Sequence, residues 1–264
     1  MRLRILGARQ GESLTTHYGA LLIDDTIALD AGSIATLLSL SEQLRLRDIV
    51  LTHHHFDHVK DLGPLGLNLR NLEPDARVDV WCTDVALTEL RATLLRGNFW
   101  IDYFAWPTPE QPTYIHHAVM EDQPFVIGGY RFRGIAMPHP IPTLGYEVLG
   151  PDGAALLYTG DNGPGAGAAW ARSRPTLLVT ECTLPNAMAD VAERAQHLTP
   201  ALLSAELEAF RVAAGYLPTV VVVHVNPAHE STIRAELAEV SVRTGAALSV
   251  ADERSEVVVS PTTC

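Results

Sequence analysis

Short apolar runs separated by turn residues dominate the first quarter of the chain and predict several β-strands. The spacing of Leu37, Leu38 and Leu40 predicts a helix over the surrounding segment, residues 34–43. Strands and helices therefore alternate from the beginning. The predicted strands are Leu3 to Leu6, Gly19 to Ile23, Ile27 to Asp30 and Ile49 to Thr52.

The same alternation continues through the rest of the chain. An aromatic and proline-rich stretch, Gly97 to Pro112, predicts a loop, and two glycine-rich turns near residues 128 and 152 predict hairpins. Two sheets with helices on their outer faces fit this order, in a single domain over residues 1–264. Further strands are expected over residues 78–82, 176–180 and 219–225, and further helices over residues 85–95, 200–214 and 231–240.

The segment after the fourth predicted strand is unusually rich in metal-binding side chains. His53 and His55 alternate along an extended chain, so they point the same way and can bind one ion. Asp57 and His58 are then placed to bind a second ion. A polar turn could explain one histidine but not this whole pattern, in which only His54 is out of phase.

Three more candidate ligands, His139, Asp161 and His224, follow apolar runs in the second half of the chain. Each alone could be a packing or turn residue. Together they complete two sets of about four ligands if Asp161 bridges both ions. Imidazole and carboxylate ligands suit zinc, manganese or iron. The expected sets are His53, His55, His139 and Asp161 for one ion, and Asp57, His58, Asp161 and His224 for the other.

Other polar residues are candidates for contact with substrate. His197 precedes a predicted helix and is a candidate general acid, which Glu181 at the end of a strand could orient. An ordinary strand-end acid is the alternative for Glu181. Asn226 follows His224 closely enough to contact a substrate, and Asn162 beside Asp161 is a second candidate. Asp57, a proposed ligand, is also counted among the catalytic residues.

Composition narrows the range of partners. The chain has 19 basic and 31 acidic residues, a net charge of −12, which disfavours binding to nucleic acid. A small anionic substrate is still compatible with this net negative charge, because metal ions supply local positive charge. No apolar run approaches the roughly 18 residues of a membrane helix. We expect reduced thiols at Cys82, Cys182 and Cys264, which favours a cytoplasmic location. A homodimer is one option for the assembly of the chain.

The motif His53-x-His55-x-Asp57-His58, followed in order by His139, Asp161 and His224, resembles the metallo-β-lactamase superfamily over nearly the whole chain. The resemblance implies an α/β fold, an αββα four-layer sandwich with a two-metal site at one edge of the sheets. It also implies a metal-bridging hydroxide as nucleophile. The substrate of such an enzyme is a phosphodiester, a thioester, a lactone or a lactam.

Finer motifs resemble the class II cyclic-nucleotide phosphodiesterase branch, which is related to ribonuclease Z. That resemblance implies hydrolysis of a small phosphodiester such as a 3′,5′-cyclic nucleotide. The chain departs from the branch at Asn162, at Thr183-Leu184 and at Asn226, which replaces a lysine. A lactonase or thioesterase, ribonuclease Z-like RNA processing and a non-catalytic metal-binding scaffold are the alternatives. The motifs lie at residues 98–103, 160–164, 181–186, 197–200 and 224–227.

Overall fold

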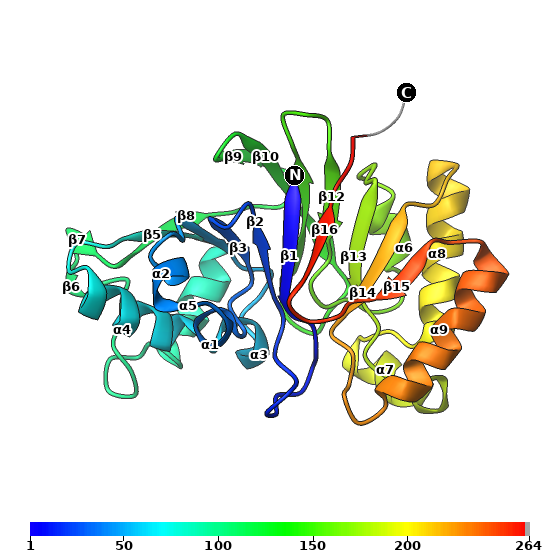
Figure 1. The fold of residues 1–264 in the computed structure, drawn as a ribbon, viewed down its shortest axis with the longest axis horizontal. Coiled ribbons are helices and arrows are strands. Elements are labelled where there is room, and N and C mark those ends of the chain that lie inside the picture. The colour runs from blue at the N-terminus through cyan, green and yellow to red at the C-terminus, as the bar shows by residue number, and fades with distance from the viewer. Residues whose placement is uncertain (262–264) are drawn as a thin grey trace.

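Two seven-stranded sheets lie face to face, and helices cover the outer face of each (Figure 1). The structure is a computed structural model that describes residues 1–261. Its four layers confirm the αββα sandwich that the sequence resemblance implies. The N-terminal half of the chain supplies most of one sheet and the C-terminal half supplies the other.

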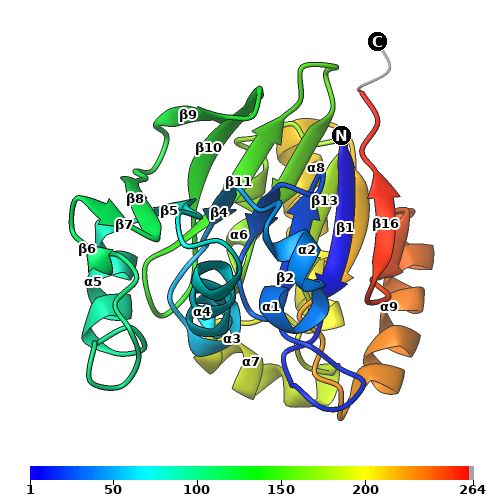
Figure 2. The ribbon, with the colours of Figure 1, turned by 60° about the vertical axis from the view of Figure 1, so that its left-hand side comes forward.

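The first sheet has the strand order β16-β1-β2-β3-β4-β5-β8, with β3, β4, β5 and β8 parallel to one another. Figure 2 shows α1, α2 and α4 in front of this sheet. The strands are β1 (Arg2–Gly7), β2 (Ala20–Ile23), β3 (Ile27–Leu29), β4 (Asp48–Val50), β5 (Val78–Cys82), β8 (Tyr114–Ala118) and β16 (Ser255–Val258). The helices of this half are α1 (Ile34–Leu37), α2 (Leu40–Gln43), α3 (Phe56–Val59), α4 (Leu62–Leu72) and α5 (Asp84–Ala92).

The second sheet has the order β15-β14-β13-β12-β11-β10-β9, with β12 to β15 parallel. Its strands are β9 (Pro124–Ile127), β10 (Tyr130–Met137), β11 (Thr143–Leu149), β12 (Ala155–Tyr158), β13 (Leu177–Glu181), β14 (Thr219–Val223) and β15 (Leu248–Val250). The helices are α6 (Ala166–Trp170), α7 (Ala189–Ala195), α8 (Pro200–Ala214) and α9 (Glu230–Thr244), with a short 3₁₀ turn η1 (Asn186–Met188).

Alternation along the strands divides the apolar residues between three cores. Leu3 and Ile5 of β1 point between the sheets, whereas Leu6 joins the core beneath the helices of the first half. In β10, Phe132 lies between the sheets and Ile135 faces the helices of the second half. Because successive strand residues point to opposite faces, each buried strand contributes to both an inner and an outer core.

Several predicted elements need correction. The predicted helix over residues 34–43 is two short helices, because Ser39 begins α2 with a capping box that includes Glu42. The aromatic stretch is not entirely irregular, since β6 (Pro107–Thr108) and β7 (Gln111–Pro112) pair within it. The sequence pattern did not predict α3, α4, α6 or α7.

The aromatic stretch packs against α4 at a glycine. A Cβ on Gly66 would lie 2.5 Å from the ring of the fully buried Tyr103. At an exposed position inside a helix, replacing glycine with alanine normally increases stability by about 1 kcal/mol. Here we expect Gly66→Ala to destabilise the protein by about 1–3 kcal/mol because of overpacking, as measured by urea unfolding.

The same substitution in a protein that lacks the Tyr103 ring tests whether overpacking causes the loss of stability. In a Tyr103→Leu variant the aromatic ring is gone, and the same glycine substitution should cost much less or become stabilising. If Gly66→Ala stabilises the protein that retains Tyr103, the close packing described here is wrong.

Three further observations bear on the sequence expectations. Among residues 1–261, no helix combines the length and apolar character that a membrane crossing needs. Cys82 and Cys182 are buried free thiols. Cys264 lies outside the described residues.

Candidate metal centre

The candidate site lies where strands of both sheets end, near α3 at the lower end of the molecule in Figure 1. The chain leaves β4, passes His53, and reaches His55, whose extended backbone leads into α3, which carries Asp57 and His58. From the second sheet, His139 follows β10, Asp161 follows β12 and His224 follows β14.

A glycine makes the approach of Asp161 to the first sheet feasible. Gly160 has a φ of +59°, and a Cβ there would lie 2.8 Å from the Thr52 side chain. Only glycine can take this left-handed conformation while passing so close to another strand end. His224 also has positive φ, +56°, which is uncommon for a residue with a side chain and is frequently found at functional sites.

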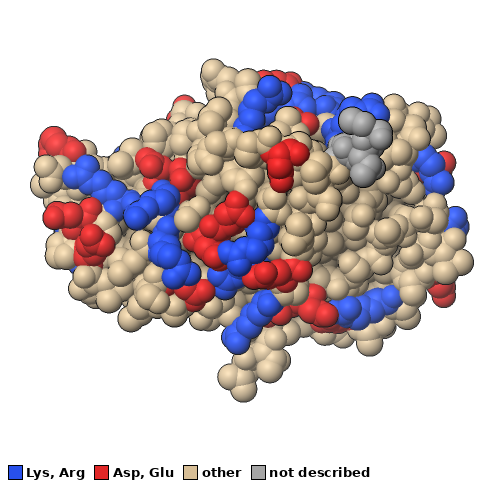
Figure 3. Space-filling model, turned by 45° about the horizontal axis from the view of Figure 1, so that its top comes forward, with Lys and Arg blue, Asp and Glu red and all other residues tan. Residues whose placement is uncertain are grey.

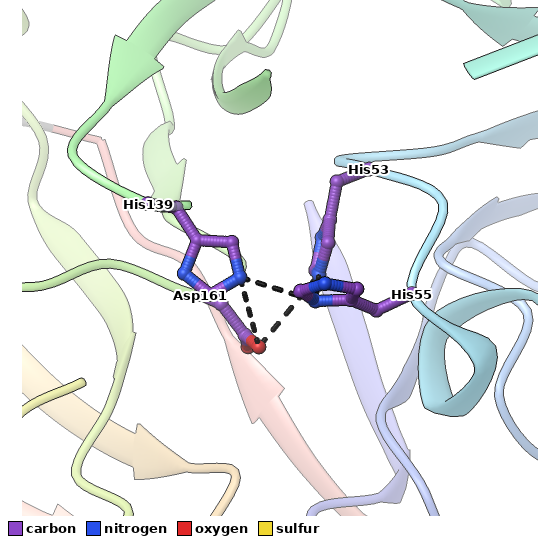
Figure 4. A group of neighbouring side chains, drawn as sticks. All are labelled: His53, His55, His139 and Asp161. Atoms are coloured by element: carbon purple, nitrogen blue, oxygen red, sulfur yellow. Dashed lines mark hydrogen bonds and ion pairs between the residues drawn. The ribbon is translucent and has the colours of Figure 1, made fainter. Parts of the chain in front are cut away.

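The first cluster consists of His53, His55, His139 and Asp161, whose ligand atoms lie within 4.8 Å of one another (Figure 4). His55 Nδ1 lies 3.0 Å from His53 Nε2 and 3.1 Å from His139 Nε2. Asp161 Oδ2 lies 3.7 Å from His53 Nε2 and 3.9 Å from His139 Nε2. Three ring nitrogens and one carboxylate oxygen thus converge on a single point.

The second cluster consists of Asp57, His58, Asp161 and His224. Asp57 Oδ2 lies 3.0 Å from His224 Nε2 and 3.8 Å from His58 Nε2. Asp161 Oδ1 lies 3.2 Å from His58 Nε2 and 3.5 Å from His224 Nε2. The two oxygens of Asp161 therefore face different clusters, as a bridging carboxylate requires.

The residues present fit two divalent cations. His58 Nε2 and Asp161 Oδ1 are buried, and neither has a hydrogen-bond partner within residues 1–261. Buried polar atoms normally have such partners, so these two are free to act as ligands. The donor set has imidazole and carboxylate but no thiolate, which suits zinc, manganese or iron. The two clusters are the same two sets of four side chains that the sequence predicts.

The pKa shifts of the ligands agree with cation binding. Burial lowers the pKa of His53 far below its usual value and, with a neighbouring imidazole, that of His55 to about 4. Burial raises the pKa of Asp57 and of Asp161, but nearby imidazoles outweigh it, so the pKa of Asp57 falls to about 2 and that of Asp161 lies well below its usual value. At His58, burial is outweighed by three carboxylates that raise the pKa. A cation can replace the proton held there.

A buried carboxylate that the sequence reading missed supports both clusters. Asp30, at a φ of +58° after β3, is fully buried. It accepts hydrogen bonds from His58 Nδ1 at 2.8 Å, from the Tyr158 hydroxyl at 2.7 Å and from Thr52. In the sequence, Asp30 has the same feature as Glu181, because both are acidic residues at the end of an apolar strand.

Glu181 is the corresponding buried carboxylate of the second sheet. His197 Nδ1 donates to Glu181 Oε1 at 2.7 Å, and the rings of His197 and His224 stack with centroids 5.4 Å apart. Burial lowers the pKa of His197, but Glu181 outweighs it and raises that pKa to about 9. The Thr183 hydroxyl donates to Glu181 Oε2 at 2.5 Å. The sequence reading expected the pairing of Glu181 with His197 but missed Thr183.

The structure separates the remaining candidates from the clusters. Asn162 is fully buried, and its Nδ2 donates to Thr159 Oγ1 at 3.0 Å, so this amide nitrogen is engaged within the protein. Asn226 Oδ1 accepts from the Ala228 N–H at 3.0 Å, which leaves Nδ2 as the group for any substrate contact. His54 belongs to neither cluster, and its ring centroid lies 6.4 Å from that of His55.

Comparisons with known proteins agree with this architecture. The unliganded yeast PDE1 structure has a TM-score of 0.79 and 16% identity, covering 97% of this chain and 98% of that chain. A metallo-β-lactamase fold protein, YhfI from Bacillus subtilis, has a TM-score of 0.76 and 16% identity, covering 97% and 98%. The short form of human tRNase Z has a TM-score of 0.71 and 17% identity, covering 98% and 99%. At these identities the likeness shows the fold alone.

Sequence comparison identifies the family. No curated protein matches the sequence. A model described as a beta-lactamase superfamily domain matches residues 31–225, which include every ligand of both clusters. Proteins of this family are metal-dependent hydrolases that bind divalent ions, typically two. The matched segment, the four-layer fold and the two clusters together establish that this chain belongs to the metallo-β-lactamase superfamily.

Proposed function

We propose that the chain is a phosphodiesterase that cleaves a small phosphodiester, such as a 3′,5′-cyclic nucleotide. The observation that carries this proposal is the Glu181–His197 pair beside the second cluster. His197 Nδ1 is bound to Glu181, so its Nε2 is the atom available to exchange a proton with a substrate. The proposed cofactors are two zinc ions, with manganese or iron as alternatives.

The leaving group explains why such a histidine favours a phosphodiester. Cleavage of a sugar phosphodiester expels a poorly stabilised alkoxide, which needs a proton as the bond breaks. A thiolate leaving group has much less need of one. Against the effect of burial, Glu181 raises the pKa of His197 to about 9, which favours the protonated imidazole that a general acid requires.

The protein residues have separate tasks in this proposal. Two divalent cations held by the two clusters would stabilise charge on the phosphoryl oxygens and activate a water molecule. Asp57, 22% exposed in its side chain, is the most exposed member of the second cluster, so it is the member that a substrate can approach. His197 protonates the leaving oxygen, and Glu181 keeps its ring in position.

Charge supports a small anion rather than a polyanion as substrate. The net charge of the chain is −12. On the upper face of the molecule, away from the site, acidic side chains lie among the basic ones (Figure 3). A nucleic-acid substrate would need a continuous basic surface along its backbone. The human tRNase Z that shares the fold is therefore a less suitable guide to the substrate than yeast PDE1.

The test is hydrolysis of cyclic AMP to 5′-AMP by protein reconstituted separately with zinc and with manganese. Asp161→Ala serves as the blank because it removes a side chain shared by both clusters. Metal-dependent turnover well above the blank supports the proposal. Turnover of bis(p-nitrophenyl) phosphate alone would keep the phosphodiesterase class but not the cyclic nucleotide. Hydrolysis only of a lactone or thioester would overturn both.

A further inference from the structure

Two buried threonine hydroxyls each lie between a buried carboxylate and a histidine of the metal centre. Thr52 Oγ1 lies 3.0 and 2.9 Å from the two oxygens of Asp30 and 2.9 Å from His53 Nδ1. The corresponding Thr183 Oγ1 lies 2.5 Å from Glu181 Oε2 and 2.9 Å from His224 Nδ1. Both threonines are nearly inaccessible to solvent, 1% and 2% exposed.

The number of protons fixes the direction of these hydrogen bonds. An ionised carboxylate only accepts, and a threonine hydroxyl has a single proton to donate. Each carboxylate also accepts a backbone N–H, from Thr52 at Asp30 and from Leu198 at Glu181. The hydroxyl proton therefore goes to the carboxylate, and the hydroxyl oxygen must accept a proton from the imidazole Nδ1.

This direction determines which imidazole nitrogen is free. With Nδ1 protonated, the unprotonated nitrogen of His53 and of His224 is Nε2. In both residues Nε2 is the atom that faces Asp161, at 3.7 Å for His53 and 3.5 Å for His224. The two histidines belong to different clusters. Each threonine thus acts on only one of the two groups of ligands.

We propose that Thr52 and Thr183 are positioning residues, each of which holds one histidine in the tautomer that can bind a divalent cation. Thr52 holds His53 of the first cluster, and Thr183 holds His224 of the second cluster. The proposal concerns the retention of metal and is independent of the substrate. A failure of the phosphodiesterase assignment would therefore leave it intact.

Threonine variants test this role more cleanly than carboxylate variants. Asp30 also binds His58, and Glu181 also binds His197, so changing either acid disturbs several groups. Valine has nearly the shape of threonine but no hydroxyl. In Thr52→Val and Thr183→Val the histidine Nδ1 loses its acceptor, and the tautomer with a proton on Nε2 competes with metal binding.

The experiment measures two properties of each purified variant. Competition with a chelator gives the dissociation constants of both zinc ions, and NMR of ¹⁵N-histidine-labelled protein gives the tautomer of each ring. We expect each valine variant to weaken mainly one ion, by about 10- to 100-fold. The histidine ring signals should show the loss of metal at His53 and His139 in Thr52→Val. In Thr183→Val they should show it at His58 and His224.

Two sets of controls separate positioning from a general packing effect. Serine at either position keeps the hydroxyl and should restore metal affinity. Thr244→Val removes a buried hydroxyl that donates to the Val240 carbonyl in α9, and it should change neither ion. If a valine variant does not fold, a cysteine variant at the same position takes its place. The cysteine thiol is a weaker hydrogen-bond donor than the hydroxyl, and the same changes in metal affinity and tautomer are expected.

Several results would overturn the proposal. Unchanged dissociation constants and tautomers in both valine variants would show that the hydroxyls have no such role. Serine variants as weak as the valine variants would point to packing instead. Equal weakening of both ions by each variant, with no change of tautomer, would also contradict the separate assignment of the threonines to the two clusters.

Discussion

Replacing Asp161 with alanine should abolish turnover and reduce the binding of both metal ions together. The two carboxylate oxygens face different clusters, Oδ1 toward His58 and His224 and Oδ2 toward His53. Loss of this one side chain removes a ligand from each cluster and the negative charge between two cations. We expect metal affinity to fall by more than the roughly 100-fold that loss of an outer hydrogen bond causes.

The measurements for Asp161→Ala are metal content after dialysis and the rate of phosphodiester hydrolysis. Asp190→Ala is the matched control, because that aspartate is exposed on α7 and belongs to neither cluster. The control should retain both ions and full activity. Retained activity in Asp161→Ala without bound metal would show that the site has been assigned to the wrong residues.

Replacing His197 with alanine should leave both metal ions in place and lower kcat by about 10²- to 10⁴-fold, the usual contribution of a general acid. His197 is not a member of either four-residue cluster, and its Nδ1 is bound to Glu181. The loss should depend on the leaving group. A p-nitrophenolate needs little protonation, so an aryl phosphodiester should lose much less rate than a cyclic nucleotide.

His116→Ala provides the control for the His197 result, since that histidine lies on the edge strand β8 and donates to or accepts from no ligand of the clusters. It should change neither metal content nor rate. If His197→Ala loses metal, the residue is a ligand and not an acid. An equal loss of rate for both leaving groups would also contradict proton donation.

The ligands were predictable because their signals are local. Four of them lie in one short segment, and the other three follow the apolar strands β10, β12 and β14 of the second sheet. Pairing of β12, β13 and β14 in parallel brings Asp161, Glu181 and His224 to the same edge. Strand-end position together with residue type was therefore enough to assign them to two sets.

The supporting residues were harder to find because their roles depend on tertiary contacts. Thr52 and Thr183 follow strands as many threonines do, and only the positions of Asp30 and Glu181 give them a task. Helix α4 was missed for a different reason. It contains Gly63, Pro64 and Gly66, which usually interrupt helices. Proline in the first turn costs no hydrogen bond there.

The glycine in α4 shows how packing overrides propensity. Gly66 lowers the intrinsic stability of its helix, but the ring of Tyr103 occupies the space that a side chain would need. Tyr103 comes from a segment that the sequence marks only as aromatic and irregular. Neither residue alone signals the contact, because they are far apart in the chain and meet only after folding.

The division of ligands between the two sheets has a consequence for the stability of the whole sandwich. His53 and His55 follow a strand of one sheet, whereas His139, Asp161 and His224 follow strands of the other. An ion bound by either cluster would therefore cross-link the two halves of the chain. The sheets could not separate while such an ion stayed coordinated, so the free metal concentration would contribute to the free energy of unfolding through mass action.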